Sequence, residues 1–233
     1  MKSSKFKKDI QADNWFSSIL DRDFYPEFIA RLNRKWPDNN FSFKRITDEE
    51  RQFQGIDLII SDSKTSIEYL IDQKAQLNYR DKKLPTFTFE LSYLKDGRNK
   101  IGWFLDSKKK TTQYFLFRHI FVSQDYHLES CLMDSIIVEK LKVFLSKFGL
   151  NDEFLLEIID NLDQSLNLED DLFKTNNENR YGFKILPQSL NKLIILSISP
   201  QLAERPVNLL IYLDRLKAME PNLFEQHNYP FPS

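Results

Sequence analysis

Two short apolar runs, separated by a polar turn, dominate the hydrophobic pattern of the first half of the chain. Residues 55–60 and 66–76 are rich in aliphatic and β-branched side chains, and the link between them is polar. Short apolar runs bounded by turn-forming residues are typical of β-strands, so this stretch predicts a β-hairpin. Charged residues interrupt it where apolar ones would be expected, at Asp57, Asp72 and Lys74.

The rest of the first half alternates helical and strand-like patterns. Apolar residues about four positions apart predict helices over residues 13–36, with Pro26 in the first turn of the second helix. Residues 47–54 are expected to form a short helix or a loop. Alternating or continuously apolar runs predict three more strands, at residues 41–46, 86–94 and 112–122. The last of these is expected to be a central strand.

The pattern changes after residue 127. Helical spacing and short apolar runs predict helices over residues 130–148, 152–166 and 203–219, and strands at residues 183–186 and 193–198. The order of elements predicts an α/β fold. Residues 1–127 would form a mixed central sheet flanked by helices, and residues 128–233 a mainly helical α/β extension of unknown role.

Composition narrows the class of protein. The chain has 233 residues and is 41% hydrophobic, which is enough for a sizeable packed core. Only five residues are glycine, and neither the G-x-x-x-x-G-K nor the G-x-G-x-x-G pattern occurs, which argues against P-loop and dinucleotide-binding folds. The net charge of −1 is not that of a protein that coats nucleic acid, so nucleic-acid contact is expected only from a local basic patch.

Cysteine, histidine and hydropathy patterns disfavour other classes. Cys131 is the only cysteine, so an intrachain disulfide is excluded and a reducing, cytoplasmic location is expected. Neither a signal peptide nor a membrane span is predicted, because no apolar leader and no run of about 18 apolar residues occurs. The three histidines show no ligand spacing, which disfavours a zinc site.

The charged residues of the hairpin indicate a specific chemistry. Side chains alternate along a strand, so Asp72 and Lys74 share one face while Gln73 points to the other, and hairpin pairing can bring Asp57 beside Asp72. Two close carboxylates repel each other, and a divalent cation such as Mg²⁺ relieves that repulsion. With a lysine beside them, these groups suit metal-assisted phosphodiester hydrolysis. The alternative is a surface hairpin whose charges form a solvated ion pair.

Asp57 followed by Asp72-Gln73-Lys74 resembles the active-site signature of the PD-(D/E)xK nucleases, the restriction-endonuclease-like superfamily, with Ile56 in place of the usual proline. Phage and mobile-element members look most similar, over roughly half of the chain. The resemblance implies a restriction-endonuclease-like core that hydrolyses DNA with Mg²⁺ or Mn²⁺. It also implies that Asp57, Asp72 and Lys74 are catalytic, and that the two acids and the backbone carbonyl of Gln73 hold the metal.

Three further residues are candidate accessory groups. Nuclease relatives often supply an extra acid from the first helical region, where Glu27 is the first candidate and Asp23 the second. Either could instead be an acid favoured at a helix start by the helix dipole. Gln76 and Glu90 follow the signature and are accessory candidates near the metal. For Glu90, an ordinary solvent-facing position on a strand is the alternative.

The most basic part of the chain is residues 95–110, where basic residues flank an apolar run. Such a segment suits phosphate contact, with a base or sugar packed on an aromatic ring. The candidate nucleic-acid-binding residues are Arg98, Lys100, Trp103, Lys108, Lys109 and Lys110. The alternative is a lysine-rich loop with Trp103 in the core.

Three classes of function remain open. The first is a Mg²⁺-dependent deoxyribonuclease in restriction, repair or mobile-element processing, whose partner is DNA. The second is a catalytically inactive protein of the same fold that acts as a binding or assembly subunit. The third is an interaction protein in which the D-x-K pattern is accidental. A homodimer or a partner protein is compatible with each, and no membrane partner is expected.

Overall fold

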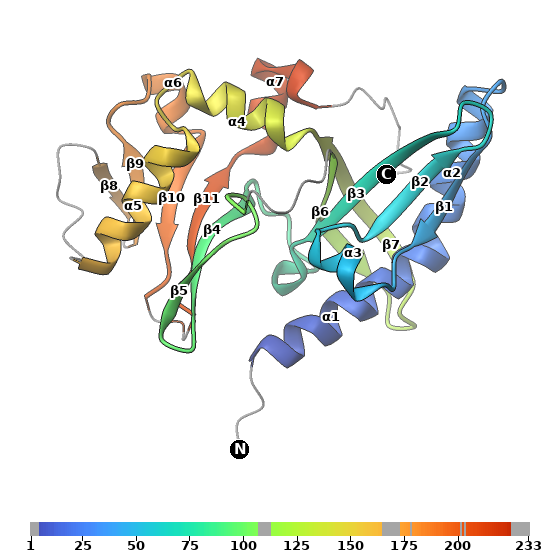
Figure 1. The fold of residues 1–233 in the computed structure, drawn as a ribbon, viewed down its shortest axis with the longest axis horizontal. Coiled ribbons are helices and arrows are strands. Elements are labelled where there is room, and N and C mark those ends of the chain that lie inside the picture. Colours follow the sequence, from blue (N-terminus) through green and yellow to red (C-terminus); the bar gives the residue numbers. More distant parts are fainter. Residues whose placement is uncertain are drawn as a thin grey trace. The chain divides into compact units, whose positions relative to one another are not determined.

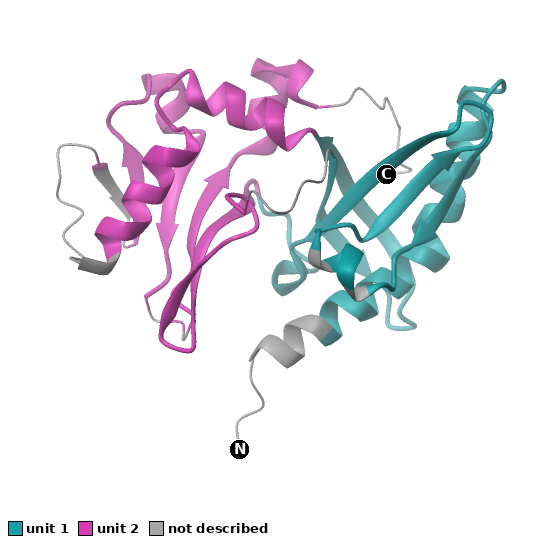
Figure 2. Ribbon diagram, in the orientation of Figure 1, with its two compact units in different colours: residues 1–84, 110–136, 227–233 teal, residues 85–109, 137–226 magenta. Residues whose placement is uncertain are grey.

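The computed structural model describes residues 5–106, 113–164, 173–177, 179–200, 202 and 204–224. These residues form two compact units, which are described separately (Figure 2). Unit 1 contains the described residues up to 84 and those from 113 to 136, and unit 2 contains those from 85 to 106 and from 137 to 224. The sequence predicts a single boundary after residue 127, and the structure differs from it. The chain enters unit 2 at residue 85, returns to unit 1 for residues 113–136, and enters unit 2 again at residue 137.

Unit 1 is built on a five-stranded mixed sheet. Its strand order is β1-β2-β3-β6-β7. The bounds are β1 Phe41–Arg45, β2 Leu58–Asp62, β3 Ile67–Ala75, β6 Gln113–Val122 and β7 Leu128–Ile136. Only β3 and β6 run parallel, and the other neighbours are antiparallel. The predicted hairpin is therefore confirmed, and the strand predicted at residues 112–122 lies inside the sheet, between β3 and β7.

Helices cover one face of this sheet (Figure 1). They are α1 Lys5–Ile19, the single π-helical turn η1 Leu20–Phe24 and α2 Tyr25–Lys35, which follow one another without a break. Pro26 lies in the first turn of α2 and has no N–H to donate, which suits a local change in the hydrogen-bond pattern. The helices pack Phe16, Leu20 and Phe28 against the inward residues of the strands, including Leu58, Ile71 and Phe117.

The connections complete unit 1. The short helix α3 Glu49–Phe53 lies between β1 and β2, and Asp48 caps it by accepting a hydrogen bond from the backbone N–H of Arg51. The single 3₁₀ turn η2 Leu77–Tyr79 follows β3. A parallel pair requires a long crossover, and here the crossover from β3 to β6 carries two strands of unit 2.

Unit 2 contains a second, six-stranded sheet. Its order is β5-β4-β11-β10-β9-β8, and all neighbouring pairs are antiparallel. The strands are β4 Phe87–Lys95, β5 Arg98–Ile101, β8 Phe173–Asn177, β9 Arg180–Phe183, β10 Ile194–Ile198 and β11 Val207–Ile211. The helices are α4 Val138–Ser146, α5 Asp152–Gln164, α6 Gln188–Asn191 and α7 Leu213–Met219, with the 3₁₀ turn η3 Pro221–Leu223.

Two helix predictions are wrong, and with them the expectation of a mainly helical extension. Residues 128–136 form β7, and the helix predicted from residue 130 begins only at Val138. Residues 207–211 form β11, and only the end of the predicted 203–219 segment is helical. Both segments carry apolar residues at spacings that fit either state. Residues 128–136 form a strand because they pair with β6. Residues 207–211 form a strand because they pair with β4 and β10.

The class is therefore α/β, with a mixed five-stranded sheet flanked by helices. The strand predicted at residues 86–94 exists, but it belongs to the sheet of unit 2 and not to the sheet of the hairpin. No helix in the described ranges is both long enough and apolar enough to cross a membrane.

Candidate functional site

The hairpin brings the two acids close together at its open end. β2 and β3 pair from Asp62↔Ile67 to Leu58↔Ile71. The regular register ends there, because the backbone N–H of Asp57 donates to the carbonyl oxygen of Ile71 at 2.9 Å, one position out of step. The Asp57 carboxylate is near enough to Asp72 to raise the pKa of that group. The spacing in the sequence therefore corresponds to two acids that lie near each other.

Asp72 and Lys74 lie on the face of the sheet that points away from α1 and α2. Gln73, between them, contacts Tyr25 and Ser17 on the helix-covered face, and side chains alternate along a strand. On the other face, Ile59 packs with Ile46 and Ile56. Asp57 lies just before β2, and its carboxylate turns to the backbone of β3.

The Asp57 carboxylate completes the end of the ladder. β3 runs past the start of β2, so the backbone N–H of Gln73 lies beyond the last paired residue of that strand. Asp57 Oδ2 accepts this N–H at 2.8 Å. One oxygen of Asp57 therefore holds the backbone of the next strand, at the residue between Asp72 and Lys74.

Asp72 is the most unusual group of the site. Its side chain has no exposed surface, and Oδ1 pairs with the Lys74 ammonium, whose side chain is 25% exposed. Oδ2 is buried and has no hydrogen-bond partner. Burial raises the pKa of Asp72 to about 7, against the lowering effect of Lys74 and with a further increase from the Asp57 carboxylate. An unsatisfied buried carboxylate oxygen is costly, so its presence calls for an explanation.

Lys74 remains a cation at neutral pH. Burial alone would lower its pKa, but the carboxylates of Asp72 and Asp57 outweigh that effect and raise the pKa above its ordinary value. The group can therefore act through its charge and as a hydrogen-bond donor. It is not suited to remove a proton at neutral pH.

The donor set fits a divalent cation. Asp72 Oδ2 is unsatisfied, the Asp57 carboxylate lies close to it, and a cation between them would compensate both charges. In the described part of the chain, no three His, Cys, Asp or Glu side chains gather into a group that could hold a metal. The remaining ligands would have to come from a backbone carbonyl and from water, which suits Mg²⁺ because it retains several waters.

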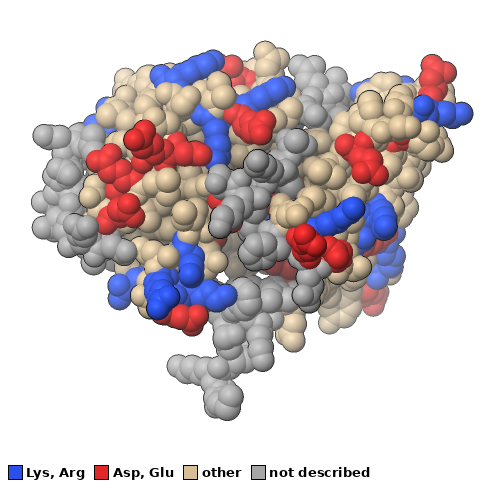
Figure 3. Space-filling model, viewed as in Figure 1, with Lys and Arg blue, Asp and Glu red and all other residues tan. Residues whose placement is uncertain are grey.

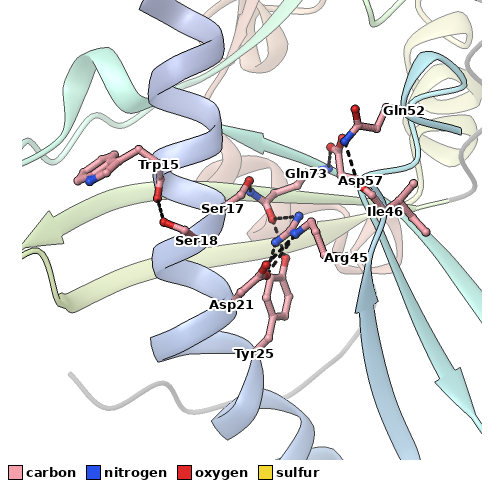
Figure 4. Close-up of polar contacts among 10 residues, drawn as sticks. All are labelled: Trp15, Ser17, Ser18, Asp21, Tyr25, Arg45, Ile46, Gln52, Asp57 and Gln73. Carbon is pink, nitrogen blue, oxygen red and sulfur yellow. Dashed lines mark hydrogen bonds and ion pairs between the residues drawn. The ribbon is translucent and has the colours of Figure 1, made fainter. Parts of the chain in front are cut away.

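The other face of β3 carries a polar network centred on Gln73 (Figure 4). Gln73 Oε1 accepts a hydrogen bond from Tyr25 Oη at 2.9 Å and one from Arg45 Nη1 at 3.1 Å. Gln73 Nε2 donates to Ser17 Oγ at 3.3 Å. Arg45 also makes a two-pronged contact with Asp21, through Nη2 to Oδ1 at 2.6 Å and Nε to Oδ2 at 3.1 Å.

This network was not predicted from the sequence, although a signal was present. Ser17, Asp21 and Tyr25 lie four positions apart, so they form one polar stripe along a helical region whose neighbouring residues are apolar. A polar stripe on the buried side of a helix indicates a partner on the opposing sheet. Arg45, at the end of a short strand, carried no comparable signal.

The predicted accessory residues have other partners. Glu27 is exposed on α2 and forms ion pairs with Arg31 and Arg34, both at 2.9 Å. Asp23 pairs with Arg22 and accepts the backbone N–H of Leu128 at 2.8 Å, which anchors the start of β7. In this helical region, the acid that lies next to Gln73 is Asp21.

The other two accessory candidates divide between the units. Gln76 continues the β3–β6 pairing, because its backbone N–H donates to the carbonyl oxygen of Phe117 at 3.2 Å. Glu90 lies on β4, in the sheet of unit 2. Gly102 approaches its backbone so closely that an added Cβ would lie 2.4 Å from the Glu90 carbonyl oxygen, which explains the glycine at that position.

Three of the predicted nucleic-acid-binding residues, Arg98, Lys100 and Trp103, are among the described residues, and all three belong to unit 2. Arg98 and Lys100 are exposed on β5, the edge strand of that sheet, and lysine and arginine side chains gather there (Figure 3). Trp103 is half-buried and packs on Phe89 and Phe104, with ring centroids 5.5 and 6.1 Å apart. These contacts give Trp103 a packing role. Lys108, Lys109 and Lys110 lie outside the described residues.

No family model, curated protein or solved structure matches this chain. Its function must therefore be inferred from its own residues and from their geometry.

Proposed function

We propose that this protein is a Mg²⁺-dependent deoxyribonuclease of the PD-(D/E)xK type that acts in the cytoplasm and hydrolyses DNA in restriction, repair or mobile-element processing. One observation carries the proposal. Asp72 is buried with an unsatisfied oxygen, beside the cation Lys74 and next in the chain to the residue whose backbone N–H the Asp57 carboxylate accepts. A hairpin with a purely structural ion pair would not need a second acid close to the buried one.

The residues of the site would divide the work. Asp57 and Asp72 would hold the cation, with the backbone carbonyl of Gln73 as a further ligand. When bound, Mg²⁺ supplies charge neutralisation for the attacked phosphate and lowers the pKa of a coordinated water. Lys74 stays protonated, so its ammonium stabilises the negative charge that develops on the phosphate and can orient the attacking group. Arg98 and Lys100 would contact DNA phosphates.

Metal binding tests the site directly. We expect Mn²⁺ to bind the wild-type protein with one site in calorimetry, and Asp57→Asn to abolish the binding because one of only two carboxylates is lost. Lys44→Ala, at an exposed position of β1, is the matched control and should bind normally. Unchanged Mn²⁺ affinity in Asp57→Asn would remove the proposed metal site.

A catalytically inactive protein of the same fold is the second candidate, and a specific observation favours it. Asp72 has no exposed surface, and one of its oxygens is occupied by Lys74. A protein of this second kind would bind DNA or a partner protein and would not cleave DNA. Incubation of plasmid DNA with Mg²⁺ or Mn²⁺ separates the two candidates, because only the first produces nicked or linear products.

A further inference from the structure

The peptide at Gln73 lies between two sets of contacts. On one side its backbone N–H is held by Asp57, next to the proposed metal ligands. The side chain of the same residue projects from the helix-covered face of the sheet, where Tyr25, Arg45 and Ser17 contact it (Figure 4). Whatever holds the side chain of Gln73 therefore also holds the backbone that connects Asp72 to Lys74.

The side-chain amide of Gln73 is well satisfied. Its oxygen accepts two hydrogen bonds and its nitrogen donates one. The charged partner is itself fixed. Arg45 is held by Asp21 through three hydrogen bonds, and its guanidinium lies 5.5 Å from the centre of the Tyr25 ring. One guanidinium group and two hydroxyl groups thus contact a single amide.

The location of this network argues for more than packing. The same face of the sheet is otherwise the main apolar core, with Phe16, Leu20 and Ile71 among its members. The Arg45–Asp21 ion pair at its edge is partly exposed, with side chains 18% and 31% exposed, and such a pair contributes little net stability. Residues that orient metal ligands are, in contrast, commonly polar and hydrogen-bonded in chains of this kind.

We propose that Tyr25, Arg45 and Asp21 are positioning residues that set the affinity of the metal site through Gln73. They fix the backbone of Gln73. The N–H of this residue holds the Asp57 carboxylate, and its carbonyl oxygen is the proposed further ligand of the metal. The ligand is the divalent cation of the proposed function, so the inference rests on that function. It adds that the site is organised from the opposite face of the sheet.

Mn²⁺ calorimetry on four variants tests this inference. Tyr25→Phe removes one hydroxyl, Arg45→Met removes the guanidinium, and Gln73→Leu removes the amide that both contact. Each should weaken Mn²⁺ binding by about 10–100-fold, which is the usual effect of losing a group that orients a ligand. The double variant Tyr25→Phe/Gln73→Leu should be no weaker than Gln73→Leu alone, because Tyr25 acts through Gln73.

Asn33→Ala is the matched control. Asn33 also ties α2 to β1, by donating to the carbonyl oxygen of Phe41 at 3.1 Å and accepting its N–H at 2.7 Å, but it does not contact Gln73. Its loss should lower the melting temperature and leave Mn²⁺ affinity unchanged. Unchanged affinity in Tyr25→Phe and Arg45→Met, or additive effects in the double variant, would overturn the inference. If Gln73→Leu does not fold, the two other single variants still decide.

Amide hydrogen exchange separates this inference from the proposed function. In metal-free protein, Tyr25→Phe and Arg45→Met should speed exchange at the Gln73 N–H, which Asp57 accepts, while Asn33→Ala should not. If the wild-type protein binds no Mn²⁺, the proposed function fails. Faster exchange at Gln73 then still supports the positioning role, and unchanged exchange overturns it.

Discussion

Two buried acid–base pairs lie on the sheet of unit 1, and they differ in how completely they are satisfied. Arg118 on β6 and Asp134 on β7 are joined by Nε and Oδ2 at 2.8 Å, with side chains only 2% and 5% exposed. Lys74 and Asp72 on β3 form the second pair. Asp72 keeps one buried oxygen without a partner, whereas no oxygen of Asp134 is in that state.

The difference separates a structural pair from a candidate working pair. Arg118 is a planar cation with several donors, so it can complete the hydrogen bonding of a buried carboxylate. Lys74 is a point charge that occupies one oxygen and leaves the other for a further cation. Both pairs use the same residue classes. The unsatisfied oxygen of Asp72, and the second acid close to it, distinguish the candidate site.

The largest expected effect is on cleavage by Lys74→Ala. Loss of the ammonium should reduce plasmid cleavage by about 10²–10³-fold or more, because it removes charge stabilisation in a buried site. The melting temperature should change little, since Asp72 can take up a proton. Lys74→Arg should not restore the rate, because the guanidinium has a different shape. Lys44→Ala is the reference variant. If Lys74→Ala cleaves plasmid DNA at the wild-type rate, the Lys74–Asp72 pair is structural, like the Arg118–Asp134 pair.

The opposite result is expected for the structural pair. Arg118→Met leaves Asp134 buried without a partner and should lower the free energy of unfolding by about 3–5 kcal/mol, measured by urea denaturation. The double variant Arg118→Met/Asp134→Leu should recover most of that loss, because no charge is then buried. If the single variant is as stable as wild type, the pair is not the structural element that its geometry indicates.

The pH dependence of stability gives a smaller effect. The pKa of Asp72 is about 7 in the folded protein and 3.8 in its unperturbed state. Its contribution to metal-free stability is therefore fully present below pH 3.8 and is lost as the pH rises toward 7. Relative to wild type, Asp72→Asn should gain on the order of 1–4 kcal/mol between about pH 4 and 7 in EDTA. Thermal unfolding across this range checks the prediction, and parallel curves for the two proteins would contradict it.

The smallest effect concerns charges that neither pair uses. Arg98→Gln/Lys100→Gln should weaken DNA binding modestly and reduce the slope of log affinity against log salt by about 0.9 for each phosphate that is no longer neutralised. A triple Lys108→Gln/Lys109→Gln/Lys110→Gln variant extends the same test. Lys147→Gln, on an exposed turn after α4, is the control. If the slope of log affinity against log salt is unchanged in both variants, the basic segment is a solvated surface that does not contact DNA.

Local patterns account for the parts of the fold that could be predicted. The hairpin of β2 and β3 depends on two apolar runs and the turn between them, and its register follows from their lengths. The end of the same hairpin holds Asp57 close to Asp72, so the acids of the candidate site could be proposed from their spacing. The helices over residues 13–35 follow from the regular repeat of their apolar side chains.

Long-range contacts decided the rest. Residues 128–136 and 207–211 are strands because β6, β4 and β10 offer them pairing partners, and no local pattern could reveal that choice. The network on Gln73 joins residues 48, 28 and 56 positions away in the chain. The sequence by itself determined which side chains lie next to each other within the hairpin. Only the tertiary structure decided that Asp72 would be buried with an unsatisfied oxygen and that Gln73 would be held from the opposite face, because both depend on elements that meet through folding.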